Sequence, residues 1–394
     1  MLFETLHPLL AASLGFTRRN RAALLPSSAD WPELIERVDQ HRLIPLLHQY
    51  LLQTGLFSSL PDSAQRDLRG RIAEIAARQL SITHALTAIL KRCAAEAIPC
   101  APLRGPALAK LLDLSMTVRA MDDIDLLVPK PSLGSLAKLL ADLGYRQIEQ
   151  RPGFAQKFSY ATSFVMMTPA PQCIDVHWTL AYPPYHDQID IEGVWRRAEQ
   201  RDFDGVAGWS ISPPDLVIHL CAHWLHKGGR GPLLWLVELD RFIRHNQDPD
   251  WSFVRQLAHS SGQWPIVRKT LAELRNLFET PLPADWLDLS SVPLPGTSAL
   301  PAALVDASFS NGPPEEWAQL VSLPALSAKV RYVVSLLWPS PEYMRWRYAV
   351  CNPMALVWAY LRRPVMLAWS VGRWWIARCF ASSPRLSSHF IQFK

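Results

Sequence analysis

The sequence predicts an α+β fold in which a small mixed sheet is flanked by helical regions on its N-terminal and C-terminal sides. Apolar residues recur at three- and four-residue spacing through residues 33–52 and 63–83, which is typical of amphipathic helices. Short apolar runs at 124–128 and 173–178 are instead typical of buried strands. Because 49% of the 394 residues are apolar and 19% are charged, the chain is folded and can bury a large core.

Five regions follow from these patterns along the chain. Residues 1–83 form an N-terminal helical region that packs beside the core, and residues 84–185 form the α/β core. Residues 186–280 return to helix. Residues 281–316 are rich in Pro, Ser and Ala and are expected to be a linker or an extended arm. Residues 317–394 form a C-terminal, Trp-rich helical region.

Within the core, helical and strand patterns alternate. Gly and Pro mark the boundaries: Pro106 suits the first position of a helix, and Gly144 suits the end of one. The expected helices are 84–97, which either continues the helix of residues 63–83 or starts separately, 107–114 and 131–143. The expected strands are 98–103, 123–128, 145–150, 155–167 and 172–180. We expect a small mixed sheet with helices on one face.

Acidic side chains mark two of these strands. Asp123 and Asp125 lie two residues apart and therefore project from one face of their strand. Two carboxylates that close repel each other unless a cation lies between them, and Mg²⁺ prefers oxygen ligands. Asp175 lies in the second apolar run and is a third candidate ligand. The alternative is a solvated turn or a helix cap, which is what most isolated Asp-x-Asp pairs are.

Two further stretches extend the same pattern. Arg104-Gly105 forms a turn before a helix, where backbone N–H groups and a guanidinium can face phosphate. His177 shares the strand face of Asp175. It either orients a metal ligand or a substrate group, or is a core histidine whose hydrogen bonds are made within the protein. Arg119 either contacts phosphate or pairs with Asp122 or Asp123.

Taken in order, Arg104-Gly105, a helix, Arg119, Asp123-Ile124-Asp125-Leu126-Leu127-Val128 and later Ile174-Asp175-Val176-His177-Trp178 resemble the nucleotidyltransferase superfamily with the polymerase-beta-like core. The resemblance is closest to the bacterial uncharacterised nucleotidyltransferase family, with LKG…R…DIDLLV…DLHW-type motifs. The chain has Arg104 where that group usually has Lys, and Gly105-Pro106 without the usual Ser. The motifs span residues 100–180, with weaker similarity at Trp235–Asp240 and Tyr343–Tyr348.

The resemblance implies a metal-dependent enzyme. It would move a nucleoside monophosphate, or a phosphoryl group, from an NTP, with ATP as the first candidate, to an acceptor hydroxyl. Asp123, Asp125 and Asp175 are then the catalytic residues that bind Mg²⁺ or Mn²⁺, whereas Arg104, Gly105, Arg119 and His177 bind the nucleotide or orient its partners. On this interpretation, removing Asp123 or Asp125 abolishes turnover and leaves the melting temperature unchanged or higher.

Two other functions stay open at this point. A non-catalytic nucleotide-binding or adaptor protein on a degenerate transferase core is favoured by the missing Ser after Gly105. A membrane-surface protein of envelope biosynthesis is favoured by residues 365–380, which mix Trp369, Trp374 and Trp375 with Arg373 and Arg378. Such a segment can lie on an anionic bilayer, or it can pack on the core or on a partner.

Composition narrows the partners. The net charge of +5 favours anionic ligands but does not indicate nucleic acid, so an NTP and a small-molecule, sugar, peptide or protein acceptor are expected. The six cysteines include no Cys-x-x-Cys pair, which favours core residues in a reducing cytoplasm. The N-terminus lacks a signal-peptide pattern, and no run of 18 uncharged apolar residues predicts a membrane-spanning helix.

A helix after Pro213 carries three histidines whose role the sequence leaves open. His219, His223 and His226 are spaced by four and three residues, so they lie on roughly one face, where a zinc site, a buried core or a substrate contact are alternatives. Asp215 either adds a ligand or serves the first helical turn. Residues 228–231 form a basic, Gly-rich turn that either reaches a phosphate or is a plain interhelix loop.

Overall fold

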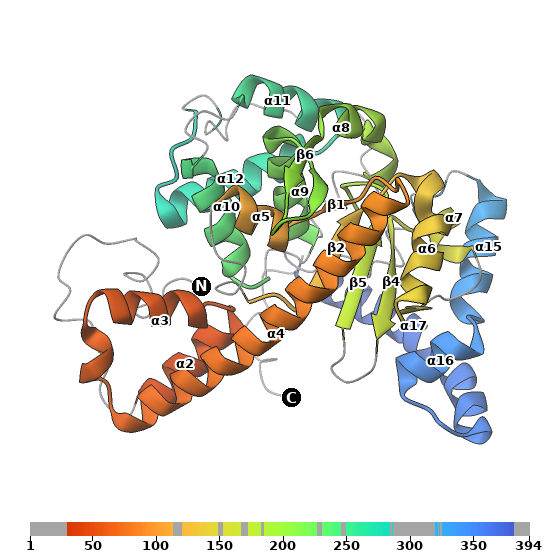
Figure 1. Cartoon of the computed structure of the whole chain (residues 1–394). Helices are drawn as coiled ribbons and strands as arrows, with labels where there is room; N and C mark the ends of the chain where they lie inside the picture. The colour runs from red at the N-terminus through yellow and green to blue at the C-terminus, as the bar shows by residue number, and fades with distance from the viewer. Residues whose placement is uncertain are drawn as a thin grey trace.

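The computed structural model (Figure 1) has a small sheet at its centre with helices around it. The structure describes residues 30–112, 120–148, 153–166, 172–182, 185–226, 231–245, 250–283, 286, 320–321, 323 and 325–381. Three of the sequence predictions lie wholly or largely outside these ranges: the role of Arg119, the basic turn at 228–231 and most of the linker at 281–316.

The central sheet has five strands in the order β1-β2-β5-β4-β3. Strands β2 and β5 are parallel, and the other neighbouring pairs are antiparallel, so the sheet is mixed as predicted. The strands are β1 (Ala101–Pro102), β2 (Asp123–Leu127), β3 (Arg146–Ile148), β4 (Ala161–Met166) and β5 (Gln172–His177).

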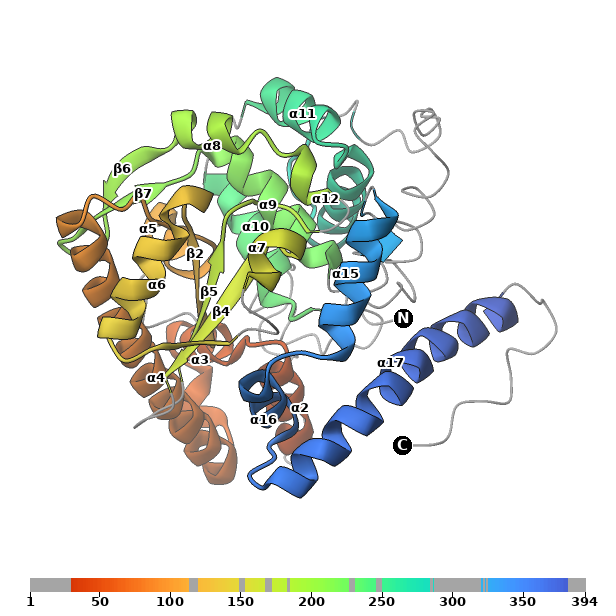
Figure 2. The same cartoon turned by 90° about the vertical axis from the view of Figure 1, so that its right-hand side faces the viewer.

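Alternation along β2 and β5 decides what each face of the sheet meets. Ile124 and Ile174 are fully buried and belong to a core shared with α4 (Asp62–Ala95) and α6 (Leu133–Asp142). The alternate residues of the two strands, such as Asp123 and Asp125 on β2, point to the other face. On that face, Leu127 joins a second core with helices from the C-terminal half. Figure 2 shows α4 and α6 on one side of the sheet and α9 and α10 on the other. The carboxylates therefore lie on the face opposite α4 and α6.

From residue 30 onward, the described part of the N-terminal region is helical, as predicted. Its helices are α2 (Trp31–Gln40), α3 (Ile44–Gln53), the 3₁₀ helix η1 (Leu56–Ser59) and the long α4. The expected helices 63–83 and 84–97 form one continuous helix of 34 residues, so α4 crosses from the first predicted region into the second. Pro45 lies in the first turn of α3 rather than inside a helix, which is where its missing N–H costs least.

The segment between the sheet and the C-terminal half differs from the sequence prediction at two places. The expected strand 155–167 begins as a helix, α7 (Phe154–Phe158), because its phenylalanines pack on Tyr332 of α15. Within the predicted helical region 186–280, a hairpin of β6 (Glu199–Asp202) and β7 (Ala207–Ser210) pairs around Gly205, which has φ of 82°. Local periodicity does not distinguish such short elements.

The remaining elements are helical. They are α5 (Gly105–Leu111), η3 (Lys130–Ser132), η4 (His186–Gln188), α8 (Ile191–Arg197), α9 (Pro213–His226), α10 (Leu234–His245), α11 (Trp251–Ser260), α12 (Trp264–Phe278), α15 (Leu326–Leu337), α16 (Pro341–Tyr348) and α17 (Pro353–Ala381). Helix α9 packs on α10, α11 and α12 around one large apolar core. After α12, Leu282 packs against this core and Trp286 is buried in it.

Pro364 lies inside helix α17, although a proline usually ends or kinks a helix because it lacks the N–H that the helix needs. The helix continues through Pro364 for 29 residues. Arg363 explains the continuity: it is 4% exposed, and its guanidinium donates to the carbonyl of Leu336 (2.6 Å) and to the hydroxyl of Tyr348 (3.1 Å). These contacts hold α17 to α15 and α16 next to the proline. In the described part of the chain, no helix is both long enough and apolar enough to cross a bilayer.

Candidate active site

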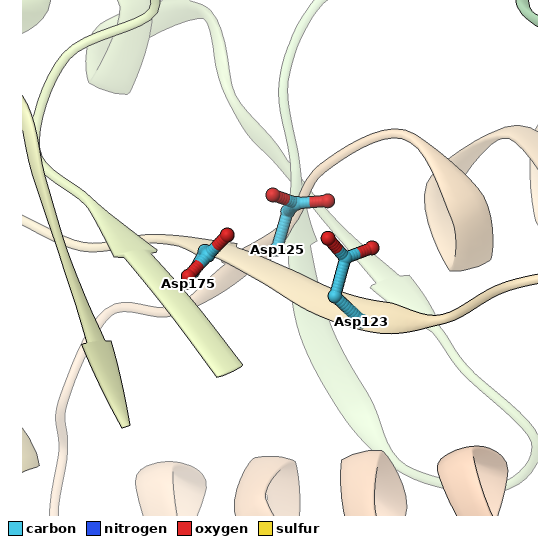
Figure 3. Close-up of side chains that lie close together, drawn as sticks. All are labelled: Asp123, Asp125 and Asp175. Carbon is cyan, nitrogen blue, oxygen red and sulfur yellow. The ribbon is translucent and has the colours of Figure 1, made fainter. Parts of the chain in front are cut away.

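Three carboxylates converge on the sheet face that α4 and α6 leave open. Asp125 of β2 lies directly opposite Asp175 of β5, and Asp123 points to the same face two residues earlier. One oxygen from each of the three carboxylates lies within 4.8 Å of the other two. Figure 3 shows the three side chains pointing toward one another from the two strands. The parallel register of β2 and β5 therefore assembles the cluster that the sequence predicted.

Asp125 is the buried member of the cluster, with 4% of its surface exposed. Its Oδ1 forms an ion pair with Nη2 of Arg104 and lies 3.2 Å from Nε2 of His177. Burial by itself would raise the pKa of Asp125, but Arg104 and then His177 outweigh it and hold the pKa well below its ordinary value. Asp125 is therefore a permanently ionised oxygen donor at neutral pH.

Asp123 has the opposite electrostatic environment. Burial and the neighbouring charge of Asp125 raise the pKa of Asp123 to about 6, although Arg104 acts in the other direction. Asp175 accepts a hydrogen bond from Oγ of Ser163 on the adjacent β4, at 2.6 Å. Arg104 thus offsets one of three clustered carboxylates, and the cluster keeps a surplus of negative charge at pH 7. Oxygen donors with surplus charge fit a divalent cation such as Mg²⁺ or Mn²⁺.

The backbone places Arg104 against Asp125. The N–H of Leu103 donates to the carbonyl of Asp125 at 2.8 Å, which sets the start of the next turn beside β2. Arg104 has φ of 50°, in the left-handed region, and turns the chain into α5. Burial works against the charge of Arg104, but Asp125 raises its pKa above the ordinary value. The guanidinium is therefore a fixed positive charge at the edge of the carboxylate cluster.

A second contact holds the other end of this guanidinium. Nη1 of Arg104 lies 3.1 Å from Nδ1 of His223 on α9, and the hydroxyl of Tyr182 lies 2.7 Å from the same nitrogen. The indole of Trp235 lies against the His223 ring, with centroids 4.1 Å apart. Helices α9 and α10 thus complete a site that begins on the sheet.

A cavity of about 380 Å³ contains the whole cluster. Its size falls within the range of small-molecule sites. Acidic, basic and aromatic side chains all contribute to its lining. The lining residues are Arg42, Arg104, Gly105, Met121, Asp123, Asp125, Ser159, Tyr160, Ala161, Ser163, Asp175, His177, Tyr182, His223 and Trp235.

Six of the seven residues that the sequence singled out as catalytic or nucleotide-binding line this cavity: Arg104, Gly105, Asp123, Asp125, Asp175 and His177. The seventh, Arg119, lies outside the described residues. Asp122 is not among the residues that line the cavity, and it pairs with Arg42 and with Arg78, the latter at 3.0 Å. The structure therefore gives Asp122 basic partners from the N-terminal helices.

The histidines of α9 divide between core and cavity. His219 is 1% exposed, and its Nδ1 lies 2.9 Å from the carbonyl oxygen of Leu180; burial lowers its pKa to about 3. His223 lines the cavity. Asp215 binds the guanidinium of Arg197 through two bonds of 2.8 and 2.9 Å. Among the described side chains, the group that could hold a metal is the three aspartates, and the side chain of His226 lies outside them.

Sequence reasoning did not assign several residues of this cavity. Tyr160 and Ser163 lie in a stretch whose only sequence signal is strand alternation, and Tyr182 and Trp235 are ordinary aromatic residues in apolar runs. Arg42 comes from the junction of α2 and α3, where its φ of 58° marks a break between helices. The four-residue histidine spacing was the one signal that pointed to His223.

A mixed sheet that presents three carboxylates beside an arginine turn has the features that the sequence resemblance predicted for a nucleotidyltransferase core. The comparison with protein families agrees. The family model described as uncharacterised nucleotidyltransferase matches residues 27–279, more than half of the chain. The protein belongs to this family. The match includes every cavity residue and ends before α15, α16 and α17.

Solved structures give a slighter likeness. The antibiotic-resistance factor ANT(2'')-Ia is 15% identical, with a TM-score of 0.31 over 51% of this chain and 95% of its own. An antigenic nucleotidyltransferase-like protein from Paracoccidioides brasiliensis is 14% identical, with a TM-score of 0.31 over 52% of this chain and 96% of its own. No curated protein matches the chain. Membership of the family therefore rests on the family model.

Proposed function

We propose that this protein transfers a nucleoside monophosphate, or a phosphoryl group, from an NTP to an acceptor hydroxyl in a reaction that needs Mg²⁺ or Mn²⁺. ATP is the first candidate for the donor. The observation that carries the proposal is the convergence of Asp123, Asp125 and Asp175 within 4.8 Å in one cavity. A core without such a function has no reason to gather three carboxylates, because their repulsion lowers stability.

The three aspartates are the residues that would hold the metal. When bound, one or two divalent ions would neutralise the attacking and leaving oxygens of an in-line displacement. Asp125 serves this purpose without a proton, because Arg104 and His177 keep it ionised. His177, at 3.2 Å, also fixes the rotation of the Asp125 carboxylate.

Arg104 supplies the positive charge for the nucleotide. A planar guanidinium binds phosphate through two parallel hydrogen bonds, and His223 and Asp125 already hold this one in place. Arg42 lines the same cavity and adds a second cation from the N-terminal helices. Gly105 follows at the start of α5, where no side chain blocks the approach of a phosphate. Arg119 remains the predicted partner of the leaving pyrophosphate.

We assign Asp175 as the base that removes the proton from the hydroxyl of the acceptor substrate. It lies on β5, one strand away from the pair on β2, and its Oδ1 already accepts the Ser163 hydroxyl at 2.6 Å. An acceptor hydroxyl that displaces this contact would meet a correctly oriented carboxylate. Tyr160, Tyr182 and Trp235 line the same cavity and offer flat surfaces to a sugar or a base.

The first experiment measures donor binding before any acceptor is known. Each of the four NTPs is titrated into the protein with and without Mg²⁺, followed by isothermal calorimetry. The proposal expects Mg²⁺-dependent binding that Asp123→Asn and Asp125→Asn both abolish. Glu279→Gln is the matched control, because this acidic residue ends α12 outside the cavity. If the NTP binds equally well with and without Mg²⁺, the result would favour the non-catalytic adaptor function.

The second experiment identifies the transferred group. The protein is incubated with the bound NTP and candidate acceptors, and the products are weighed by mass spectrometry. An added nucleoside monophosphate supports nucleotidyl transfer, and an added phosphate supports phosphoryl transfer. If the NTP binds with Mg²⁺ and neither product forms with any acceptor class, the catalytic part of the proposal fails.

A further inference from the structure

Exposed apolar surface is concentrated in the C-terminal helices. Among the described residues, 14 large apolar side chains are exposed; Leu52 and Leu80 are two of them, and the other 12 lie between residues 326 and 369. The 12 are Leu326, Val330, Val334, Trp338, Trp346, Met354, Val357, Trp358, Leu361, Val365, Met366 and Trp369. This clustering indicates a surface that another molecule covers.

Helix α17 carries seven of these side chains, and all of them except Met366 form one stripe. Its exposed residues follow helical spacing, so they occupy one face of the helix. The stripe consists of Met354, Val357, Trp358, Leu361, Val365 and Trp369, which are exposed by 55 to 72%. The opposite face is used within the protein, since Ala359 and Arg363 are buried there. Figure 2 shows α17 as a long helix at the edge of the molecule beside α15 and α16.

The charge of this part of the chain has one sign. From residue 343 to residue 394 the sequence contains eight Lys and Arg residues and no Asp or Glu. The eight are Arg345, Arg347, Arg362, Arg363, Arg373, Arg378, Arg385 and Lys394. Of those that the structure describes, Arg345, Arg347 and Arg362 are exposed. The surface is thus apolar and cationic together.

This combination discriminates among possible occupants. A second copy of the chain would bring the same positive charge against this face, which opposes self-association. An anionic bilayer meets both properties, because apolar side chains enter the boundary of the acyl chains while arginines contact lipid phosphates. Tryptophan, of which the stripe has two, prefers the interface between headgroups and acyl chains.

We infer that α17 docks on an anionic lipid bilayer and lies along its surface, with the stripe of Met354, Val357, Trp358, Leu361, Val365 and Trp369 facing the acyl chains. Arg363 keeps the opposite face attached to α15 and α16, so the whole protein is held at the membrane. The sequence predicted membrane contact at residues 365–380, whereas the exposed stripe begins about three helical turns earlier, at Met354. The surface lies beyond the family match at residue 279, so it is separate from the proposed reaction.

The test is flotation of the full-length protein with vesicles of phosphatidylcholine, with and without phosphatidylglycerol. The protein is expected to float with the anionic vesicles at low salt and less at high salt, because the electrostatic part is screened. The double variant Trp358→Gln/Trp369→Gln should weaken binding by about tenfold or more, since two large aromatic side chains leave the apolar face. Arg362→Gln should weaken it by about fivefold.

The control is Leu80→Gln, which replaces a side chain that is 61% exposed on α4, in the N-terminal half of the chain. It should float like the unchanged protein, and so should Asp123→Asn, which separates membrane docking from the proposed chemistry. Three results would overturn the inference. These are no flotation with anionic vesicles, equal flotation of the double Trp variant, or a dimer in solution that the same double variant dissociates.

Discussion

Asp123 and Asp125 lie two residues apart on one strand, yet removing their charges should change stability in opposite directions. The ionised form of Asp123 destabilises the folded protein, because burial and the charge of Asp125 raise its pKa from 3.8 to about 6. The ionised form of Asp125 is stabilised in the folded protein, because Arg104 and His177 contact it in a buried position. The sequence alone led us to expect an unchanged or raised melting temperature when either aspartate is removed. From the structure, we expect a raised melting temperature for Asp123 variants and a lowered one for Asp125 variants.

The size of each effect follows from these contacts. A raised pKa means that the folded state binds the Asp123 proton more tightly, so stability falls as pH rises from about 4 to about 6. Two pKa units correspond to about 3 kcal/mol, and solvent access reduces this to about 2 kcal/mol. Asp123→Asn should therefore raise the melting temperature at pH 8 by about 2–3 °C.

Asp125→Asn should do the reverse. The substitution leaves the guanidinium of Arg104, which is 11% exposed, without its charged partner. Removing one member of a buried ion pair costs about 3–5 kcal/mol, which corresponds to about 4–6 °C for a protein of this length. The neutral amide still fits the space, so the loss reports charge rather than packing.

Thermal unfolding in EDTA at pH 8, followed by circular dichroism, measures both shifts. Asp187→Asn is the control, because that carboxylate is 88% exposed, and its melting temperature should match that of the unchanged protein. If Asp123→Asn and Asp125→Asn move the melting temperature in the same direction, the charge balance derived for the cluster is wrong.

Further outcomes follow from the same contacts. The difference in melting temperature between the unchanged protein and Asp123→Asn should appear between pH 4 and pH 6 and stay constant above pH 7; a difference that persists at pH 4 would contradict the raised pKa. Mg²⁺ should raise the melting temperature of the unchanged protein, and an equal rise in Asp123→Asn would place the cation elsewhere. Arg104→Lys should weaken NTP binding by about tenfold in calorimetry, since lysine keeps the charge but cannot form the two parallel hydrogen bonds of a guanidinium. Unchanged affinity would show that Arg104 does not bind the phosphates. Arg363→Met should speed hydrogen exchange in residues 353–381, because the bonds to Leu336 and Tyr348 are lost, and equal protection would show that other contacts hold α17.

Some elements required tertiary information even where their sequence pattern was strong. The strand pattern of 155–167 is interrupted by α7, because Phe154 and Phe158 pack on Tyr332, more than 170 residues later. Pro364 normally ends a helix, but Arg363 bonds to neighbouring helices and the helix continues. In both cases a contact far along the chain outweighs a local preference.

The sequence by itself determined that Asp123 and Asp125 share a face, because side chains two apart on a strand point the same way. It also determined the class, through the order of the arginine turn, the acidic pair and the second acidic strand. Only the tertiary structure decided that β5 lies parallel to β2 with Asp175 opposite Asp125, and that Arg104, His177 and His223 surround the pair. Local patterns fix which way a side chain points, whereas strand pairing and helix packing over long separations fix what it meets.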